Sequence, residues 1–102
     1  MMATYNKLPA EVFDIYKDFS APLGSDTIQS IVAVTSINER TGLDSTADIV
    51  ATSPPPSISG SKVFYWVKGG AVSEQHKVTI TIATAGGREF SDVDHIVVWS
   101  GA

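Results

Sequence analysis

The chain has 102 residues, 43% of them hydrophobic, so it is long enough for one small domain with a single core. Its net charge is −4 and its seven Lys and Arg residues are scattered singly, which argues against nucleic-acid binding because phosphates require a basic patch. Without cysteine there are no disulfides, thiolate metal sites or cysteine nucleophiles. No apolar run approaches the ~20 residues of a membrane span, and none marks a signal peptide at the N-terminus.

The first 20 residues predict an arm followed by a strand. We expect residues 1–10 to form an N-terminal arm, either extended or with one helical turn opening at Pro9. Residues 12–19 alternate imperfectly, because Lys17 falls among the apolar positions and Tyr16 among the polar ones. A strand is the prediction for this segment and a helix is the competing one.

The middle of the chain predicts strands and one stiff crossover. Residues 27–36 are rich in β-branched side chains, which favours a strand. Residues 43–52 predict a weak strand, or two short ones. Pro54, Pro55 and Pro56 lack amide donors, so we expect a crossover between two sheets there rather than a central strand.

The clearest strand signals lie in the last half. Residues 58–67 are apolar on both sides, which indicates a strand with one face in the core and the other covered, either by the core or at an interface. Residues 77–84 alternate strictly, with Val78, Ile80 and Ile82 predicted to be buried. Residues 89–99 predict the last strand.

Two glycine pairs punctuate this half of the chain. Gly69 and Gly70 end one strand, and Gly86 and Gly87 end the next. We expect Gly86 and Gly87 to form a hairpin turn in which at least one glycine has φ > 0. With turns about every ten residues, the sequence predicts an all-β fold, an antiparallel β-sandwich of about seven strands, with residues 11–102 as one domain.

Few residues suggest chemistry. Asp92, Asp94 and His95 resemble a metal half-site, but neighbouring strand residues point to opposite faces, and a solvated loop is the preferred interpretation. Nothing pairs a base with a nucleophile, so we predict a non-enzyme with no catalytic residue, no metal and no cofactor.

Aromatic residues mark the predicted contact sites. The candidate interface residues are Phe64, Tyr65, Trp66 and Trp99. Packing in a core or an interface is the commoner role of such side chains. The alternative is an aromatic platform in a carbohydrate- or receptor-binding β-sandwich module.

Three segments, taken in their order along the chain, resemble small phage virion proteins of the fibre–tail adaptor type. The first carries a proline, a strand and an L-G-x-D-T-I motif; the second ends a strand in V-x-x-W-x-x-G-G; the third closes in a V-T-x-x-I-x-T-x-x-G-R pattern. These motifs read here as Pro9, Val12-Phe13-Asp14, Asp18-Phe19-Ser20, Leu23 to Ile28, Val63, Trp66, Gly69, Gly70, His76, Val78-Thr79, Ile82, Thr84 and Gly87-Arg88. The chain differs from the family at His76, Phe19 and Ala33, where the family has Tyr, Trp and Trp.

The resemblance implies an immunoglobulin-like sandwich that serves as a non-enzymatic virion structural protein. It implies an adaptor linking neck or tail components or tail fibres through contacts with other virion proteins (portal, neck, tail or fibre). It further implies a homo-oligomeric ring, assembled in the bacterial host cytoplasm, with no nucleic-acid or membrane partner. The segment 35–60 varies within the family, and we expect either this segment or the N-terminal arm to carry partner contacts.

Overall fold

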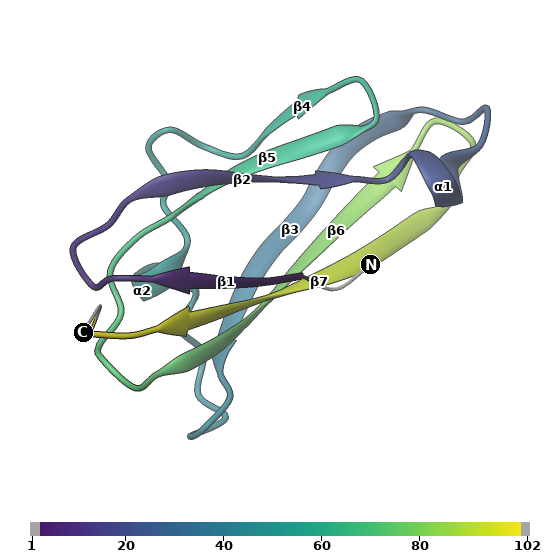
Figure 1. Ribbon diagram of the computed structural model, residues 1–102. Coiled ribbons are helices and arrows are strands. Elements are labelled where there is room, and N and C mark those ends of the chain that lie inside the picture. Colours follow the sequence, from purple (N-terminus) through teal and green to yellow (C-terminus); the bar gives the residue numbers. More distant parts are fainter. Residues whose placement is uncertain (1–2, 101–102) are drawn as a thin grey trace.

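A computed structural model describes residues 3–100, which form seven strands and two short helices (Figure 1). The elements in chain order are β1 (Ala3–Lys7), β2 (Phe13–Asp18), α1 (Ser20–Leu23), β3 (Ile28–Asn38), α2 (Thr46–Ile49), β4 (Ser57–Ser59), β5 (Lys62–Val67), β6 (Gln75–Thr84) and β7 (Glu89–Val98). Residues 13–18 form the strand β2, so the competing helix prediction for residues 12–19 was wrong, and the one helical turn, α1, begins only at Ser20.

The strands form two packed sheets. The four-stranded sheet has the order β1-β7-β6-β3 and the three-stranded sheet the order β2-β5-β4. With strands lettered A to G in chain order, these sheets are A-G-F-C and B-E-D, so strands B, E, D and C, F, G divide as in an immunoglobulin-like sandwich. The predicted all-β sandwich is confirmed. One detail of the prediction was wrong, because β1 pairs with β7 in parallel and the fold is not antiparallel throughout.

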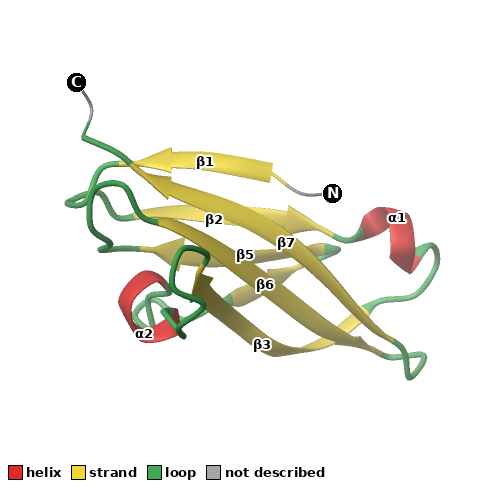
Figure 2. Cartoon of the chain, turned by 90° about the horizontal axis from the view of Figure 1, so that it is seen from below, coloured by secondary structure: helices red, strands yellow, loops and turns green. Residues whose placement is uncertain are grey.

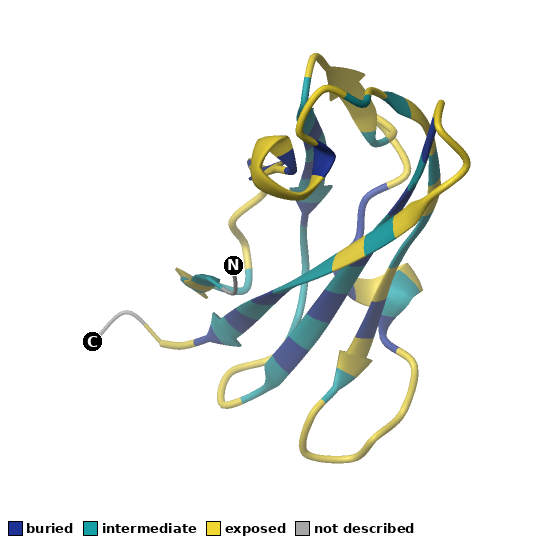
Figure 3. Ribbon diagram, turned by 90° about the vertical axis from the view of Figure 1, so that its right-hand side faces the viewer, coloured by how far each residue is buried: buried dark blue, intermediate teal, exposed yellow. Residues whose placement is uncertain are grey.

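The β6–β7 hairpin has the predicted register. Val78, Ile80 and Ile82 are fully buried, and their neighbours on the other face are half-buried. Figure 3 shows this alternation of dark and lighter bands along the long strands. The period of two therefore assigned the inner face correctly, because a slip of one residue would have exposed all three side chains.

The crossover, by which we mean the whole segment between β3 and β4, differs from the strand predicted for residues 43–52. Instead of a strand, this segment contains α2. The Asp44 carboxylate accepts hydrogen bonds from both the amide and the hydroxyl of Thr46, at 3.0 and 2.7 Å, which favours a turn over an extended chain. Ile49 and Val50 then insert into the core. The proline segment follows and joins β3 of one sheet to β4 of the other, as predicted.

Residues 58–67 are also divided. They form most of the β4–β5 hairpin, which turns at Gly60, rather than one continuous strand. The two helices lie toward opposite ends of the sandwich (Figure 2). Each contributes one aliphatic side chain to the core, Leu23 from α1 and Ile49 from α2.

The N-terminal residues expected to be an arm join the sheet from Ala3 onward. Residues 8–11 make a turn and not a helix, since the Glu11 amide bonds the Leu8 carbonyl at 3.0 Å. At the end of β1 the Lys7 ammonium is fully buried. It donates to the carbonyls of Leu8, Pro9 and Gly69, and burial lowers its pKa. Lys7 thereby fastens the first strand to the glycine pair after β5.

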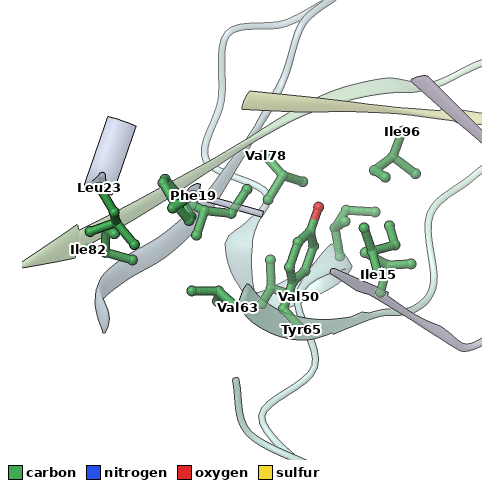
Figure 4. Packing of buried hydrophobic residues seen from close by; sticks show 12 residues of the cluster. Ile15, Phe19, Leu23, Val50, Val63, Tyr65, Val78, Ile82 and Ile96 are labelled. Carbon is green, nitrogen blue, oxygen red and sulfur yellow. The ribbon is translucent and has the colours of Figure 1, made fainter. Parts of the chain in front are cut away.

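The core lies between the sheets and includes one large polar side chain. Its buried members are Ile15, Phe19, Leu23, Ile49, Val50, Val63, Tyr65, Val67, Val78, Ile80, Ile82 and Ile96. Figure 4 shows Tyr65 standing among these aliphatic groups with its hydroxyl directed toward the opposite sheet. That hydroxyl donates to the Asp94 carboxylate at 2.6 Å, and burial, reinforced by the Asp94 charge, raises the pKa of Tyr65 strongly.

Lys17 explains the imperfect alternation of β2. Its side chain points inward, as its position among the apolar residues requires, and its ammonium lies 2.7 Å from the Asp94 carboxylate. An inward lysine on β2 therefore meets an inward aspartate on β7, and the charge is paired across the sandwich.

Candidate protein interaction surface

The outer side of the three-stranded sheet carries three aromatic side chains, which we call the aromatic face: Tyr16, Phe64 and Trp66. Tyr16 is directly opposite Phe64 in the β2–β5 pair, and Trp66 is opposite Asp14. Paired residues share one side of the sheet, so the three rings emerge together. The rings of Tyr16 and Phe64 pack at 5.7 Å between centroids, tilted by 41°.

Alternation along β5 places these rings outside. Val63, Tyr65 and Val67 are fully buried, so the residues between them must face outward. Phe64 and Trp66 are half-buried and Tyr16 is 53% exposed. This surface is apolar where the outer side of a sandwich is ordinarily polar.

Charged groups border the aromatic face. The Lys62 ammonium lies 4.8 Å from the Tyr16 ring centroid, in a cation–π contact. Asp18 is opposite Lys62 in the register. Its carboxylate accepts hydrogen bonds from the Ser20 amide at 2.8 Å and the Ser61 hydroxyl at 3.0 Å, and chiefly the Ser20 bond lowers the pKa of Asp18. An apolar centre with a charged border is the usual anatomy of a protein interface.

A second surface feature is a groove of about 590 Å³ between β3 and the crossover. Most of its lining is aliphatic, and its lining residues are Ile31, Val32, Ala33, Val34, Asp44, Thr46, Ala47, Val50, Ala51, Thr52 and Pro56. Val32 lies at an irregularity in the β3–β6 register and is 51% exposed. The groove therefore lies between β3, which is at the edge of its sheet, and part of the segment 35–60, in which we expected partner contacts.

The predicted interface residues separate in the structure. Phe64 and Trp66 lie on the aromatic face. Tyr65 is fully buried and belongs to the core, so it offers no surface to a partner in the folded domain. Trp99 is 45% exposed just beyond the end of β7, on the other sheet, and its amide donates to the Lys7 carbonyl.

Sequence reasoning missed Tyr16 as an interface residue. The available signal was its parity with Asp14 and Asp18, which marked it as outward-facing on β2. Only the β2–β5 register, which the sequence does not reveal, brings it against Phe64.

The predicted turn glycines are where they were expected. Gly69 and Gly70 follow β5, and Gly86 and Gly87 connect the antiparallel strands β6 and β7. Gly87 has φ of 84°, so the predicted left-handed turn residue is present. At Gly86 a β-carbon would meet a carboxylate oxygen of Asp26 at 2.7 Å, so any other residue there would require the Asp26 side chain to shift.

Asp92, Asp94 and His95 lie within β7, so the solvated loop predicted for them was wrong. Asp94 points inward to Lys17, whereas the His95 ring bonds Glu39 on the outside, at 2.8 Å. His76 is buried between Ser45 and Glu74, at 2.8 and 3.1 Å, and Ser45 shares a further hydrogen bond with Ser36. Ser45 is itself 4% exposed, so we interpret this network as one that fastens the crossover to β6.

Among residues 3–100, no three His, Asp or Glu side chains gather as a metal site would require. In the same part of the chain, no helix has both the length and the apolar character needed to cross a membrane.

Comparison with known proteins gives a family match over nearly the whole sandwich. A family model described as podophage GP4 fiber-tail adaptor protein gp77 matches residues 7–98, which extend from the end of β1 to the end of β7. No match to the chain is found among curated proteins or among solved structures. The resemblance seen in the sequence motifs is confirmed, and the chain belongs to the podophage GP4 fiber-tail adaptor protein gp77 family.

Proposed function

We propose that this chain is a non-enzymatic adaptor of the phage virion that joins tail and fibre components as a ring whose subunits meet through the aromatic face. Family membership supports a structural role as a fibre–tail adaptor. The observation that carries the proposal is the emergence of Tyr16, Phe64 and Trp66 together on one outer sheet surface. Clustered aromatic side chains of this kind supply most of the binding energy in protein interfaces.

The proposed assembly is a ring of copies of this chain. A ring requires two different surfaces on each subunit, because a head-to-tail contact repeats around an axis. The aromatic face is one such surface, and the groove lined by β3 and the crossover is the second. A stable contact between them should bury at least ~1,000 Å² in total.

The remaining partners are other virion proteins. A ring has two ends besides its subunit contacts, and the surfaces there meet a tail component on one side and a fibre on the other. Assembly takes place in the host cytoplasm. The carbohydrate-binding alternative gains no support from the family match.

The proposal is tested on purified particles. Mass spectrometry of virions should detect this chain as a component, and a map of the particle should show several copies in a ring near the fibres. Particles from a phage lacking the gene should carry no fibres and fail to infect. Virions that lack the protein, or that assemble and infect normally without it, would overturn the adaptor role.

A further inference from the structure

Lys17 and Asp94 form a buried ion pair between the two sheets. The Lys17 nitrogen lies 2.7 Å from an oxygen of the Asp94 carboxylate, and the two side chains are 7% and 0% exposed. Buried ion pairs contribute little net stability, because removing both charges from water is costly. The pair also joins opposite layers of the sandwich, since Lys17 is on β2 and Asp94 on β7. We propose that Lys17 and Asp94 react in the folded chain to form an amide cross-link between the two sheets.

The contact geometry prepares both groups for the reaction. The reacting forms are the neutral amine, which is a nucleophile, and the carboxylic acid, whose carbon is electrophilic. The fold holds the nitrogen beside that carbon, which replaces a bimolecular encounter with a fixed approach.

The bonds balance without any other reagent. The Lys17 nitrogen bonds to the side-chain carbonyl carbon of Asp94, and the bond from this carbon to its hydroxyl oxygen breaks. One proton leaves the nitrogen and departs with the hydroxyl as water, so an amine and an acid give an amide and one water. No oxidant, reductant or cofactor takes part.

Neighbouring groups are positioned to assist. The Tyr65 hydroxyl donates at 2.6 Å to the second Asp94 oxygen, where negative charge develops when the nitrogen attacks. The Asp92 carboxylate is 3.7 Å from the Lys17 nitrogen, so one bridging water would relay the nitrogen's proton to it and back to the leaving hydroxyl. Exclusion of water from the Asp94 side then protects the amide from hydrolysis.

The cross-link would supply what a disulfide supplies in other sandwiches. Antibody domains of this architecture tie their sheets together with a buried disulfide, and this chain has no cysteine. The bond would join residues that are 77 positions apart in the chain. Cross-links that close long loops restrict the unfolded state most.

Intact mass of the full purified chain, measured after denaturation, tests the proposal. The expected mass is lower than the sequence mass by about 18 Da, one water, once the observed N-terminus is taken into account. Proteolysis should yield a branched peptide that contains both Lys17 and Asp94. Wild-type protein that is folded by circular dichroism and has the full sequence mass would overturn the proposal.

Two variants sharpen the result. Lys17→Arg keeps a positive charge beside Asp94 but does not provide the amine, so it should show its full sequence mass. Asp94→Asn would release ammonia in place of water, so its loss should be about 17 Da. If Lys17→Arg does not fold, the wild-type mass and the branched peptide decide the question alone. A branched peptide that joins any other pair of residues would contradict the assignment.

Discussion

The two outer sides of the sandwich differ in kind. On the four-stranded sheet, the three central outward pairs of β6 and β7 form what we call the polar face, in which only Val93 is apolar: Lys77, Thr79, Thr81, Ser91, Val93 and His95. On the three-stranded sheet, the aromatic face presents Tyr16, Phe64 and Trp66. Both sheets cover the same core, and both alternate regularly between inward and outward residues.

The difference shows that the aromatic face is not a requirement of the fold. Threonine and serine on the polar face are typical of a sheet surface that is exposed to water. Threonine is also β-branched, so it favours a strand even where no other protein covers the sheet. The same architecture could carry such residues on β5. Large rings in their place support the proposal that this surface is covered by a partner.

The largest expected effect is a difference in the free energy of unfolding between variants on the inward and outward sides of β5. Tyr65→Ala should lower the free energy of unfolding by about 3–5 kcal/mol, because it empties a core site and removes the hydrogen bond to Asp94. Phe64→Ala, one residue away and facing outward, should cost less than about 1 kcal/mol. Urea denaturation of both variants measures these costs. Equal losses would mean that the aromatic face serves stability and is not kept for an interface.

The next effect concerns the hairpin that sets the register of the polar face. Gly87→Val should lower the free energy of unfolding by about 1–3 kcal/mol, because a β-branched residue tolerates positive φ poorly. The matched variant Ala85→Val changes an exposed residue in the same turn whose φ is not positive, and should cost less than about 0.5 kcal/mol. Similar melting temperatures for the two variants would contradict this role of Gly87.

A smaller, pH-dependent effect arises at the same hairpin. The Thr84 hydroxyl, followed by the Thr27 amide and Arg88, lowers the pKa of Asp26 from 3.8 to about 2. Because the pKa is depressed in the folded state, the stabilisation is complete above the usual aspartate pKa and is lost as pH falls from about 4 to about 2. The melting temperature of Asp26→Asn should therefore change less over that range than that of the wild type. Parallel curves would rule out Asp26 as a source of the acid sensitivity.

The parts of the fold that followed from sequence are those set by local pattern. Strict alternation defined the inner face of β6, and glycine positions defined the hairpin. The crossover was mispredicted because its turn is stabilised by hydrogen bonds from the amide and hydroxyl of Thr46 to the Asp44 carboxylate, in a segment with few large aliphatic residues. Local pattern is weak evidence where a few polar contacts favour a turn over a strand.

The candidate site needed information that the sequence does not contain. Phe64 and Trp66 were identified because β5 is apolar on both sides, but which side faces outward was settled by the partner residues in the core. Tyr16 joined them only through the register between β2 and β5. Lys17 interrupts the apolar alternation of β2, and the sequence did not explain it. Its partner, Asp94 on β7, is 77 residues further along the chain.

The most direct test of the central claim compares one charge placed on each outer face. A phage lacking the gene is complemented with Phe64→Glu or with Thr79→Glu, and the copies of the protein in purified virions are counted by quantitative mass spectrometry. We predict that both purified variants fold with similar melting temperatures. Phe64→Glu should be incorporated at least about tenfold less than the wild type, because a charge replaces an aromatic contact, whereas Thr79→Glu should be incorporated normally. Normal incorporation of Phe64→Glu would contradict the account.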